Sequence, residues 1–108
     1  MKKIAQQLNW KKLNNLIPVV AQDYKTNKVL MVGFMNKEAL RKTLKEGKVT
    51  YFSRTRKKLW TKGETSGNFQ IVKEILQDCD SDTLLIKVRQ IGNVCHTDHT
   101  SCFYQKIL

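Results

Sequence analysis

The stretch that decides the fold is residues 17–47, IPVVAQDYKTNKVLMVGFMNKEALRKTLKEG. Two apolar runs, Ile17–Gln22 and Lys28–Met35, flank a polar segment that ends at Asn27. Asparagine tolerates the left-handed backbone of a tight turn better than most residues, so this pattern predicts a β-hairpin.

A helix is predicted directly after the hairpin. Asn36 is a favourable N-cap residue, and Gly47 stands where a C-cap glycine belongs. Between them, Lys37–Glu46 places its apolar side chains on one side, as an amphipathic helix requires: Ala39, Leu40 and Leu44.

The rest of the chain contains further short β-prone runs at Val49–Ser53, Phe69–Leu76 and Thr83–Arg89. A weakly amphipathic segment over residues 4–13 predicts a second, short helix. Several short strands with one or two short helices indicate an α+β fold with a mostly antiparallel sheet. The 108 residues contain no linker or repeat, so we expect a single domain over residues 1–108.

The composition excludes several classes of protein. No apolar run is long enough to span a membrane, and the charged N-terminus lacks the apolar core of a secretory signal. Three cysteines make an odd and sparse set, which disfavours a disulfide scaffold and favours the cytoplasm. The net charge of +11 implies an anionic partner such as nucleic acid, a membrane surface or a phosphorylated small molecule; the alternative is an ordinary lysine-rich surface.

The three cysteines, Cys79, Cys95 and Cys102, form no C-x-x-C pair. One interpretation is that they are small buried hydrophobic residues. The other is a zinc site, because polar side chains surround all three thiols. Three thiolates leave one tetrahedral position for water, as in catalytic sites, unless His96 or His99 occupies it and makes the site structural.

Three aspartates, Asp78, Asp80 and Asp82, alternate around Cys79. On a strand their side chains would share one face, and in a loop they would converge on one hard cation such as Mg²⁺. Thr83 and Arg89 stand where a calcium-binding EF-hand needs glycine and glutamate. The alternative is a solvated acidic turn.

Residues 53–70, SRTRKKLWTKGETSGNFQ, combine basic side chains with glycines. Arginine and lysine bind phosphate, and a turn containing Gly63 and Gly67 presents backbone N–H groups to an anion. Trp60 offers a ring for stacking on a base. The alternative is an ordinary basic hairpin.

Taken together, SRTRKKLWTKGETSGN, DCDSD and GNVCHTDHTSCF resemble the phosphoribosyl-AMP cyclohydrolase family of histidine biosynthesis, over roughly residues 10–104. The resemblance implies an intertwined, cytoplasmic homodimer that hydrolyses the N1–C6 bond of the adenine ring of 1-(5-phosphoribosyl)-AMP and binds neither nucleic acid nor membrane. It implies zinc shared between subunits on Cys79, Cys95 and Cys102, and magnesium on Asp78, Asp80 and Asp82. It makes His96 the general acid or base, and it assigns substrate binding to Arg54, Arg56, Trp60, Lys62, Gly63, Glu64, Ser66, Gly67 and Asn68.

The sequence departs from the family pattern at two turns. Asp98 stands where the family commonly has glycine, and Asn27 replaces the hairpin glycine. We also expect no second, pyrophosphohydrolase activity of the kind that some relatives carry. Two other functions compete with the cyclohydrolase: a basic zinc-containing nucleic-acid module, and a zinc-stabilised interaction domain with four protein ligands and no catalysis.

Overall fold

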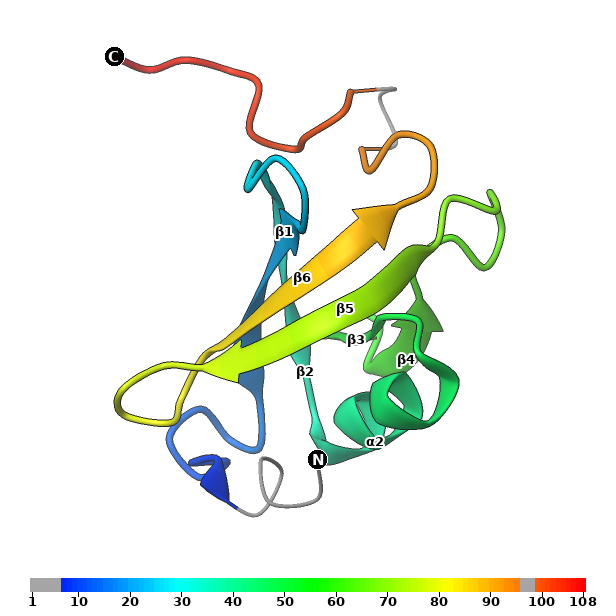
Figure 1. Cartoon of the computed structure of the whole chain (residues 1–108). Coiled ribbons are helices and arrows are strands. Elements are labelled where there is room, and N and C mark those ends of the chain that lie inside the picture. Colours follow the sequence, from blue (N-terminus) through cyan, green and yellow to red (C-terminus); the bar gives the residue numbers. More distant parts are fainter. Residues whose placement is uncertain (1–6, 96–98) are drawn as a thin grey trace.

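The computed structural model describes residues 7–95 and 99–108 of the chain, which form two β-sheets and one helix of ten residues (Figure 1). The elements follow in the order β1 (Ile17–Asp23), β2 (Val29–Met35), α2 (Lys37–Glu46), β3 (Thr50–Ser53), β4 (Lys58–Thr61), β5 (Gln70–Gln77) and β6 (Leu84–Gln90). The α+β prediction is therefore confirmed for the described part of the chain.

The larger sheet has the strand order β2-β1-β6-β5, and β3 pairs with β4 in a separate two-stranded sheet. Three pairings are antiparallel, as predicted: β1 with β2, β3 with β4, and β5 with β6. The pairing of β1 with β6 is parallel, which the sequence pattern did not predict. A parallel pair needs a long crossover connection, and here α2, β3 and β4 all lie within that connection.

The predicted hairpin and helix are confirmed together with their end residues. Asn27 has the left-handed φ of 62° that the turn between β1 and β2 requires. The Asn36 side chain accepts a hydrogen bond from the Ala39 backbone N–H at 2.8 Å, which caps α2. Gly47 ends the helix with φ 73°, and its N–H donates to the Thr43 carbonyl at 2.9 Å.

The helix predicted over residues 4–13 is wrong for residues 8–13, which run through bends and turns; residues 4–6 lie outside the described part. The Asn9 N–H donates to the Ser81 carbonyl at 2.7 Å, in the turn between β5 and β6. The Leu8 and Trp10 side chains are buried in the core. Packing and this long-range hydrogen bond therefore override a weak helical pattern.

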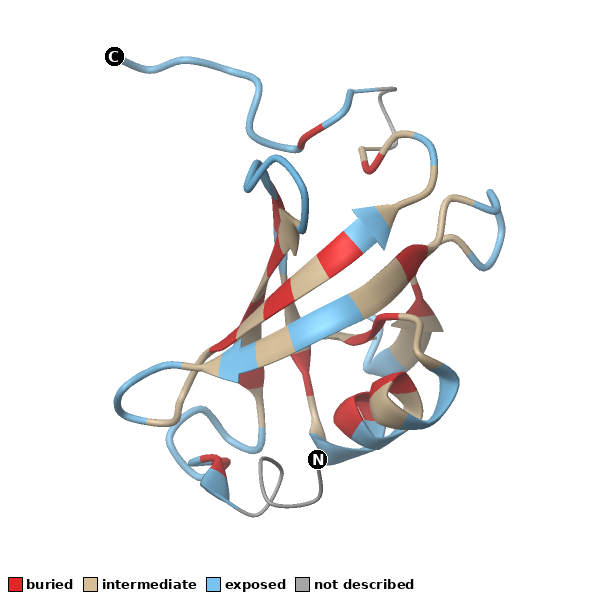
Figure 2. Cartoon of the chain, viewed as in Figure 1, coloured by how far each residue is buried: buried red, intermediate tan, exposed pale blue. Residues whose placement is uncertain are grey.

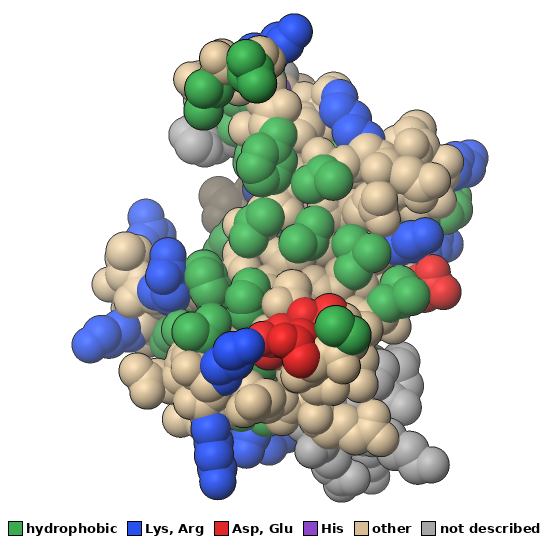
Figure 3. Space-filling model, turned by 90° about the vertical axis from the view of Figure 1, so that its left-hand side faces the viewer, with side chains coloured by type: hydrophobic (Ala, Val, Ile, Leu, Met, Phe, Trp, Pro, Cys, Tyr) green, Lys and Arg blue, Asp and Glu red, His purple; other side chains and the backbone are tan. Residues whose placement is uncertain are grey.

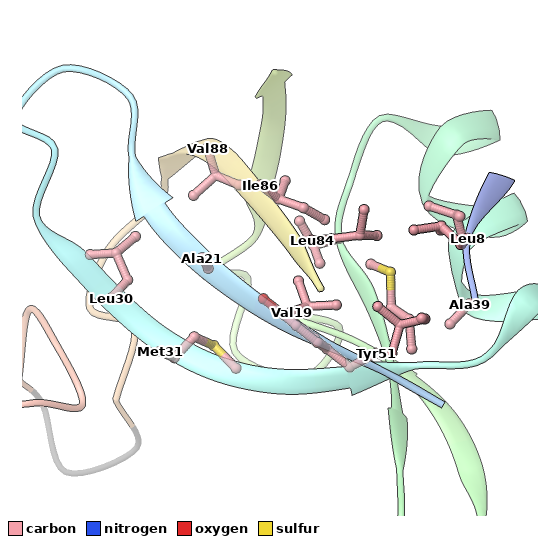
Figure 4. Packing of buried hydrophobic residues seen from close by; sticks show 14 of the residues in the cluster. Leu8, Val19, Ala21, Leu30, Met31, Ala39, Tyr51, Leu84, Ile86 and Val88 are labelled. Atoms are coloured by element: carbon pink, nitrogen blue, oxygen red, sulfur yellow. The ribbon is translucent and has the colours of Figure 1, made fainter. Parts of the chain in front are cut away.

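The core lies between one face of the larger sheet and the layer made by α2 and β3. Buried residues alternate with exposed or half-buried ones along β1 and β6, as Figure 2 shows. Val19, Leu84 and Ile86 of the sheet and Tyr51 of β3 belong to one cluster of buried side chains in this layer (Figure 4). A Cβ on Gly33 of β2 would lie 2.6 Å from the Tyr51 ring, so glycine there lets the ring pack flat on the strand.

The cap of α2 gives a direct test of this local structure. We expect Asn36→Ala to lower the free energy of unfolding by about 1 kcal/mol, because the Ala39 N–H loses its side-chain acceptor. Asn36→Asp keeps an acceptor at the same place and is the matched control. Chemical denaturation measures both, and equal stability of the alanine variant and the wild type would contradict the capping role.

Candidate functional site

The basic, glycine-containing segment forms a pocket of about 480 Å³ at β4 and the loop that follows it. The loop closes through a hydrogen bond from the Gly67 N–H to the Gly63 carbonyl, 2.7 Å long. Gly63 has φ +87°, and a Cβ there would lie 2.4 Å from the Asn68 carbonyl carbon and the Phe69 nitrogen. The loop therefore depends on glycine at position 63 both for its backbone angle and for space.

Three basic side chains and one acidic side chain line the pocket, so the field inside it attracts anions. Among the residues predicted to bind substrate, Arg56, Trp60, Lys62, Gly63, Glu64 and Ser66 line this pocket, whereas Arg54, Gly67 and Asn68 do not. Lys58 and Thr65 of the basic segment also line the pocket. The sequence prediction missed two further lining residues, Ser53 and Thr61, which the pairing of β3 with β4 brings into place.

Two of the predicted residues have aromatic neighbours that were not foreseen. The Arg54 guanidinium lies 4.1 Å from the centroid of the Phe34 ring, a cation–π contact that holds it beside β2. The Trp60 ring stacks on Tyr51 with its centroid 5.1 Å away and 29° between the planes. Trp60 is thus fixed by the core on one side while it lines the pocket.

Cys95 and Cys102 lie at one end of the larger sheet, close to each other. Cys95 follows the end of β6, and the Cys102 N–H donates to the Leu30 carbonyl at 2.7 Å, near the start of β2. The Ser101 hydroxyl donates to the Val29 carbonyl at 2.8 Å, so two successive residues attach the C-terminal segment to β2.

The surroundings of the Cys102 thiol favour its neutral form. Burial raises the pKa of the Cys102 thiol above its ordinary value, and the neighbouring Cys95 thiol raises it further. The Lys62 ammonium acts in the opposite direction. Two adjacent thiols become good ligands once a divalent metal ion compensates the charge of their thiolates.

Cys79 lies in the turn between β5 and β6, at the opposite end of β6 from Cys95 (Figure 1). In the described ranges 7–95 and 99–108, the only group of three metal-competent side chains consists of Asp78, Asp80 and Asp82, whose ligand atoms all lie within 4.8 Å of one another. The three thiols therefore do not meet within one chain. The aspartates therefore lie in a loop where their oxygens converge, and not along one face of a strand.

A lysine already neutralises part of this acidic loop. The Lys12 ammonium forms an ion pair with the Asp82 carboxylate and lies 3.7 Å from a carboxylate oxygen of Asp80. The hydrogen bond from Lys12 holds the pKa of Asp82 far below its usual range. The pKa of Asp80 is raised, because it shares hydrogen bonds with Asp78 and Asp82.

The structure describes only one of the two histidines, His99. His96 lies outside the described residues, as does Asp98, so the roles predicted for them stay predictions. The His99 ring is exposed and stacks on Tyr104, with the ring centroids 3.5 Å apart and the planes nearly parallel. The His99 carbonyl accepts a hydrogen bond from the Cys95 N–H at 3.2 Å.

The pocket and the thiol pair are neighbours. Lys62 lines the pocket, and its ammonium donates to the Val94 carbonyl, immediately before Cys95, at 2.5 Å. A basic pocket beside two metal-competent thiols has the chemistry to accommodate a phosphorylated ligand next to a metal ion.

Comparison with known proteins identifies the family of the chain. The model of the phosphoribosyl-AMP cyclohydrolase family matches residues 31–104, and the chain therefore belongs to this family. The chain is 50% identical over 105 residues to the phosphoribosyl-AMP cyclohydrolase of Clostridium beijerinckii, covering 97% of this chain and 96% of that protein. It is 55% identical over 100 residues to the Clostridium botulinum protein of the same name, covering 93% and 92%.

Longer relatives also match. The chain is 63% identical over 92 residues to the histidine biosynthesis bifunctional protein HisIE of Thermoanaerobacter pseudethanolicus. This match covers 85% of the chain but 43% of that relative, so the chain spans less than half of the bifunctional proteins of this kind.

No helix among the residues that the structure describes is long and apolar enough to cross a membrane.

The ion pair at the acidic loop predicts a measurable titration. We expect Lys12→Met to raise the pKa of Asp82 towards its ordinary value, because the carboxylate loses the cation that favours its charged form. Carboxyl-detected NMR titration measures the shift, and Lys11→Met is the control, since no ion pair is found for Lys11 in the described residues. An unchanged Asp82 titration in the Lys12 variant would contradict the pairing.

Proposed function

We propose that this protein hydrolyses the adenine ring of 1-(5-phosphoribosyl)-AMP in histidine biosynthesis. Water adds at C6, the N1–C6 bond breaks, and a proton is delivered to the departing nitrogen, which gives the formimino aminoimidazole-carboxamide ribonucleotide. The observation that carries the proposal is that a cationic pocket lies directly against the thiol pair, through Lys62 and the Val94 carbonyl, in a chain of this family.

The pocket suits a substrate that carries two phosphate monoesters. Arg56, Lys58 and Lys62 face one cavity, and only one carboxylate, that of Glu64, opposes them there. Charge-assisted hydrogen bonds from such donors to phosphate are about twice as strong as those between neutral groups. We assign phosphate binding to these three cations and contact with the base to Trp60.

We assign a catalytic zinc ion to Cys95 and Cys102 together with Cys79 of a second copy of the chain. The donor set supports this assignment, since thiolates are preferred zinc ligands and the two C-terminal thiols are already adjacent. When bound, zinc supplies hydroxide near neutral pH by lowering the pKa of a coordinated water. Because Cys79 lies at the far end of β6, one chain does not complete the site by itself.

The proton that the leaving nitrogen needs is assigned to His96, which the family resemblance makes the general acid or base. Histidine titrates near neutral pH and therefore donates and accepts protons at the working pH of such an enzyme. His96 directly follows Cys95 in sequence, so it lies within one residue of a proposed zinc ligand.

We assign a magnesium ion to the acidic loop, with Asp78, Asp80 and Asp82 as ligands. The convergence of their oxygens within 4.8 Å supports this, because Mg²⁺ prefers oxygen ligands and bridges to phosphate. Asp78 and Asp80 flank Cys79, so a second copy that contributes Cys79 also brings these carboxylates to the pocket.

The second copy is proposed to form a homodimer. The outer face of the larger sheet carries an apolar row made by Val32, Val20, Leu85 and Leu76, which the strand register places side by side across all four strands. Val32 is 48% and Leu76 40% exposed. Figure 3 shows hydrophobic side chains gathered on one side of the molecule next to a group of acidic ones. Burying such a row stabilises an association by the hydrophobic effect.

We further propose a cytoplasmic location, because an odd number of cysteines in a chain of this size suits a reducing compartment.

The proposed activity is tested with 1-(5-phosphoribosyl)-AMP and the purified protein. We expect imidazole-carboxamide absorbance to rise, and we expect Cys95→Ser to lose both bound zinc and turnover. Lys45→Met, on the exposed side of α2, is the control for general damage. Absence of turnover by the metal-loaded wild type would refute the activity, and full turnover by metal-free Cys95→Ser would refute the role of zinc.

The shared site is tested by complementation between two inactive variants. Cys79→Ser and Cys95→Ser are co-expressed with different tags, and the mixed dimer is isolated by two affinity steps. One of its two sites combines both serines, while the other has all three cysteines, so we expect about half of the wild-type zinc and activity. A mixed dimer as inactive as its parents would show that the three thiols do not meet between chains.

A further inference from the structure

Both backbone carbonyls that precede Cys95 accept hydrogen bonds from side chains of the pocket segment. The Asn68 side-chain N–H donates to the Asn93 carbonyl at 3.1 Å, and the Lys62 ammonium donates to the Val94 carbonyl at 2.5 Å. The donors lie 25 and 32 residues before their acceptors. Two long-range hydrogen bonds thus fix the two successive peptide groups immediately before Cys95.

The Asn68 side chain packs closely against Gly92. Gly92 has a left-handed φ of +66°, and a Cβ on it would lie 2.4 Å from the Asn68 side-chain oxygen. The Asn68 side chain therefore occupies the space that any other residue at position 92 would fill. This close approach holds the amide against the turn that leads to Cys95.

Asn68 is also anchored to the core by a chain of side-chain hydrogen bonds. The Tyr51 hydroxyl donates to Gln70 at 2.6 Å, Gln70 donates to the Gln90 side-chain oxygen at 3.0 Å, and Gln90 donates to the Asn68 carbonyl at 3.2 Å. Tyr51 and Gln70 are fully buried. A buried network in which all polar groups are hydrogen-bonded is rigid, so it fixes the loop at Asn68 relative to the core.

Lys62 makes the second contact from a half-buried position. Its ammonium lies 5.8 Å from the Trp60 ring centroid, and no carboxylate of the described residues pairs with it. A charged donor on a neutral carbonyl forms a hydrogen bond stronger than one between neutral groups. The Val94 side chain is fully buried, so both its packing and the hydrogen bond from Lys62 fix this peptide group.

We propose that Lys62 and Asn68 are positioning residues for Cys95: they fix the turn of residues 92–95 and so aim its thiol at the metal. This inference rests on the proposed function and deepens it. It gives Asn68, which does not line the pocket, a role at the metal centre, and it gives Lys62 a second role besides ligand binding. Groups that orient metal ligands from outside the coordination shell typically change metal affinity by 10–100-fold.

The test uses full-length Lys62→Met and Asn68→Leu, which remove each donor without adding charge. We expect each variant to weaken zinc binding about tenfold in competition with a chromophoric chelator, and to weaken the thiolate-to-metal absorption of the cobalt-substituted protein. Lys62→Arg keeps a donor and is expected to restore most of the affinity. Lys45→Met is the matched control on α2, with zinc binding unchanged.

A second measurement needs no metal. The Cys95 N–H, at the end of the turn of residues 92–95, donates to the His99 carbonyl. We expect hydrogen exchange at this amide to become about tenfold faster in both metal-free variants, with α2 amides unchanged. Variants that match the wild type in zinc affinity and in exchange would overturn the positioning role alone. A wild type that binds no zinc would overturn the proposed metal centre, and this inference with it.

Discussion

The strand β6 is the constraint on which the arrangement of the site depends. It is paired on both edges, in parallel with β1 and antiparallel with β5, so its direction and position are fixed by two ladders. With a rise of about 3.3 Å per residue, its seven residues hold its two ends roughly 20 Å apart. The acidic turn with Cys79 precedes this strand and Cys95 follows it, which is why one chain separates the thiols.

The pocket end of the molecule is organised by buried polar groups as much as by apolar packing. Tyr51 stacks on Trp60, lies flat on Gly33 and donates its hydroxyl to Gln70. One buried ring thus supports a pocket wall, the sheet and the polar chain that leads to Asn68. An unpaired polar group in this layer would cost about 1–3 kcal/mol, so the network constrains a single arrangement of the loops.

Local signals explain what the sequence predicted and what it did not. The hairpin and α2 were predictable because Asn27, Asn36 and Gly47 act through their own backbone angles and caps. The strand β4 was not, because Lys58–Thr61 is too short for a clear alternation and lies in a basic run. The parallel β1–β6 pair and the hydrogen bond from Lys62 to Val94 are long-range contacts, which no local pattern encodes. Residue types singled out the cysteines, aspartates and basic residues as candidate site residues, but they did not show which of them the fold brings together.

Charge adds an independent argument for the proposed pairing of two copies. The cations Arg56, Lys58 and Lys62 gather at the pocket, while the carboxylates of Asp78 and Asp80 project at the other end of β6, only partly neutralised by Lys12. Placing the acidic turn of one copy over the pocket of the other would bring opposite potentials together, which favours association and fixes its orientation. The same placement would complete the set of three thiols. If the carboxylates of the acidic turn held a metal ion, its charge would add to that of the pocket cations around the substrate phosphates.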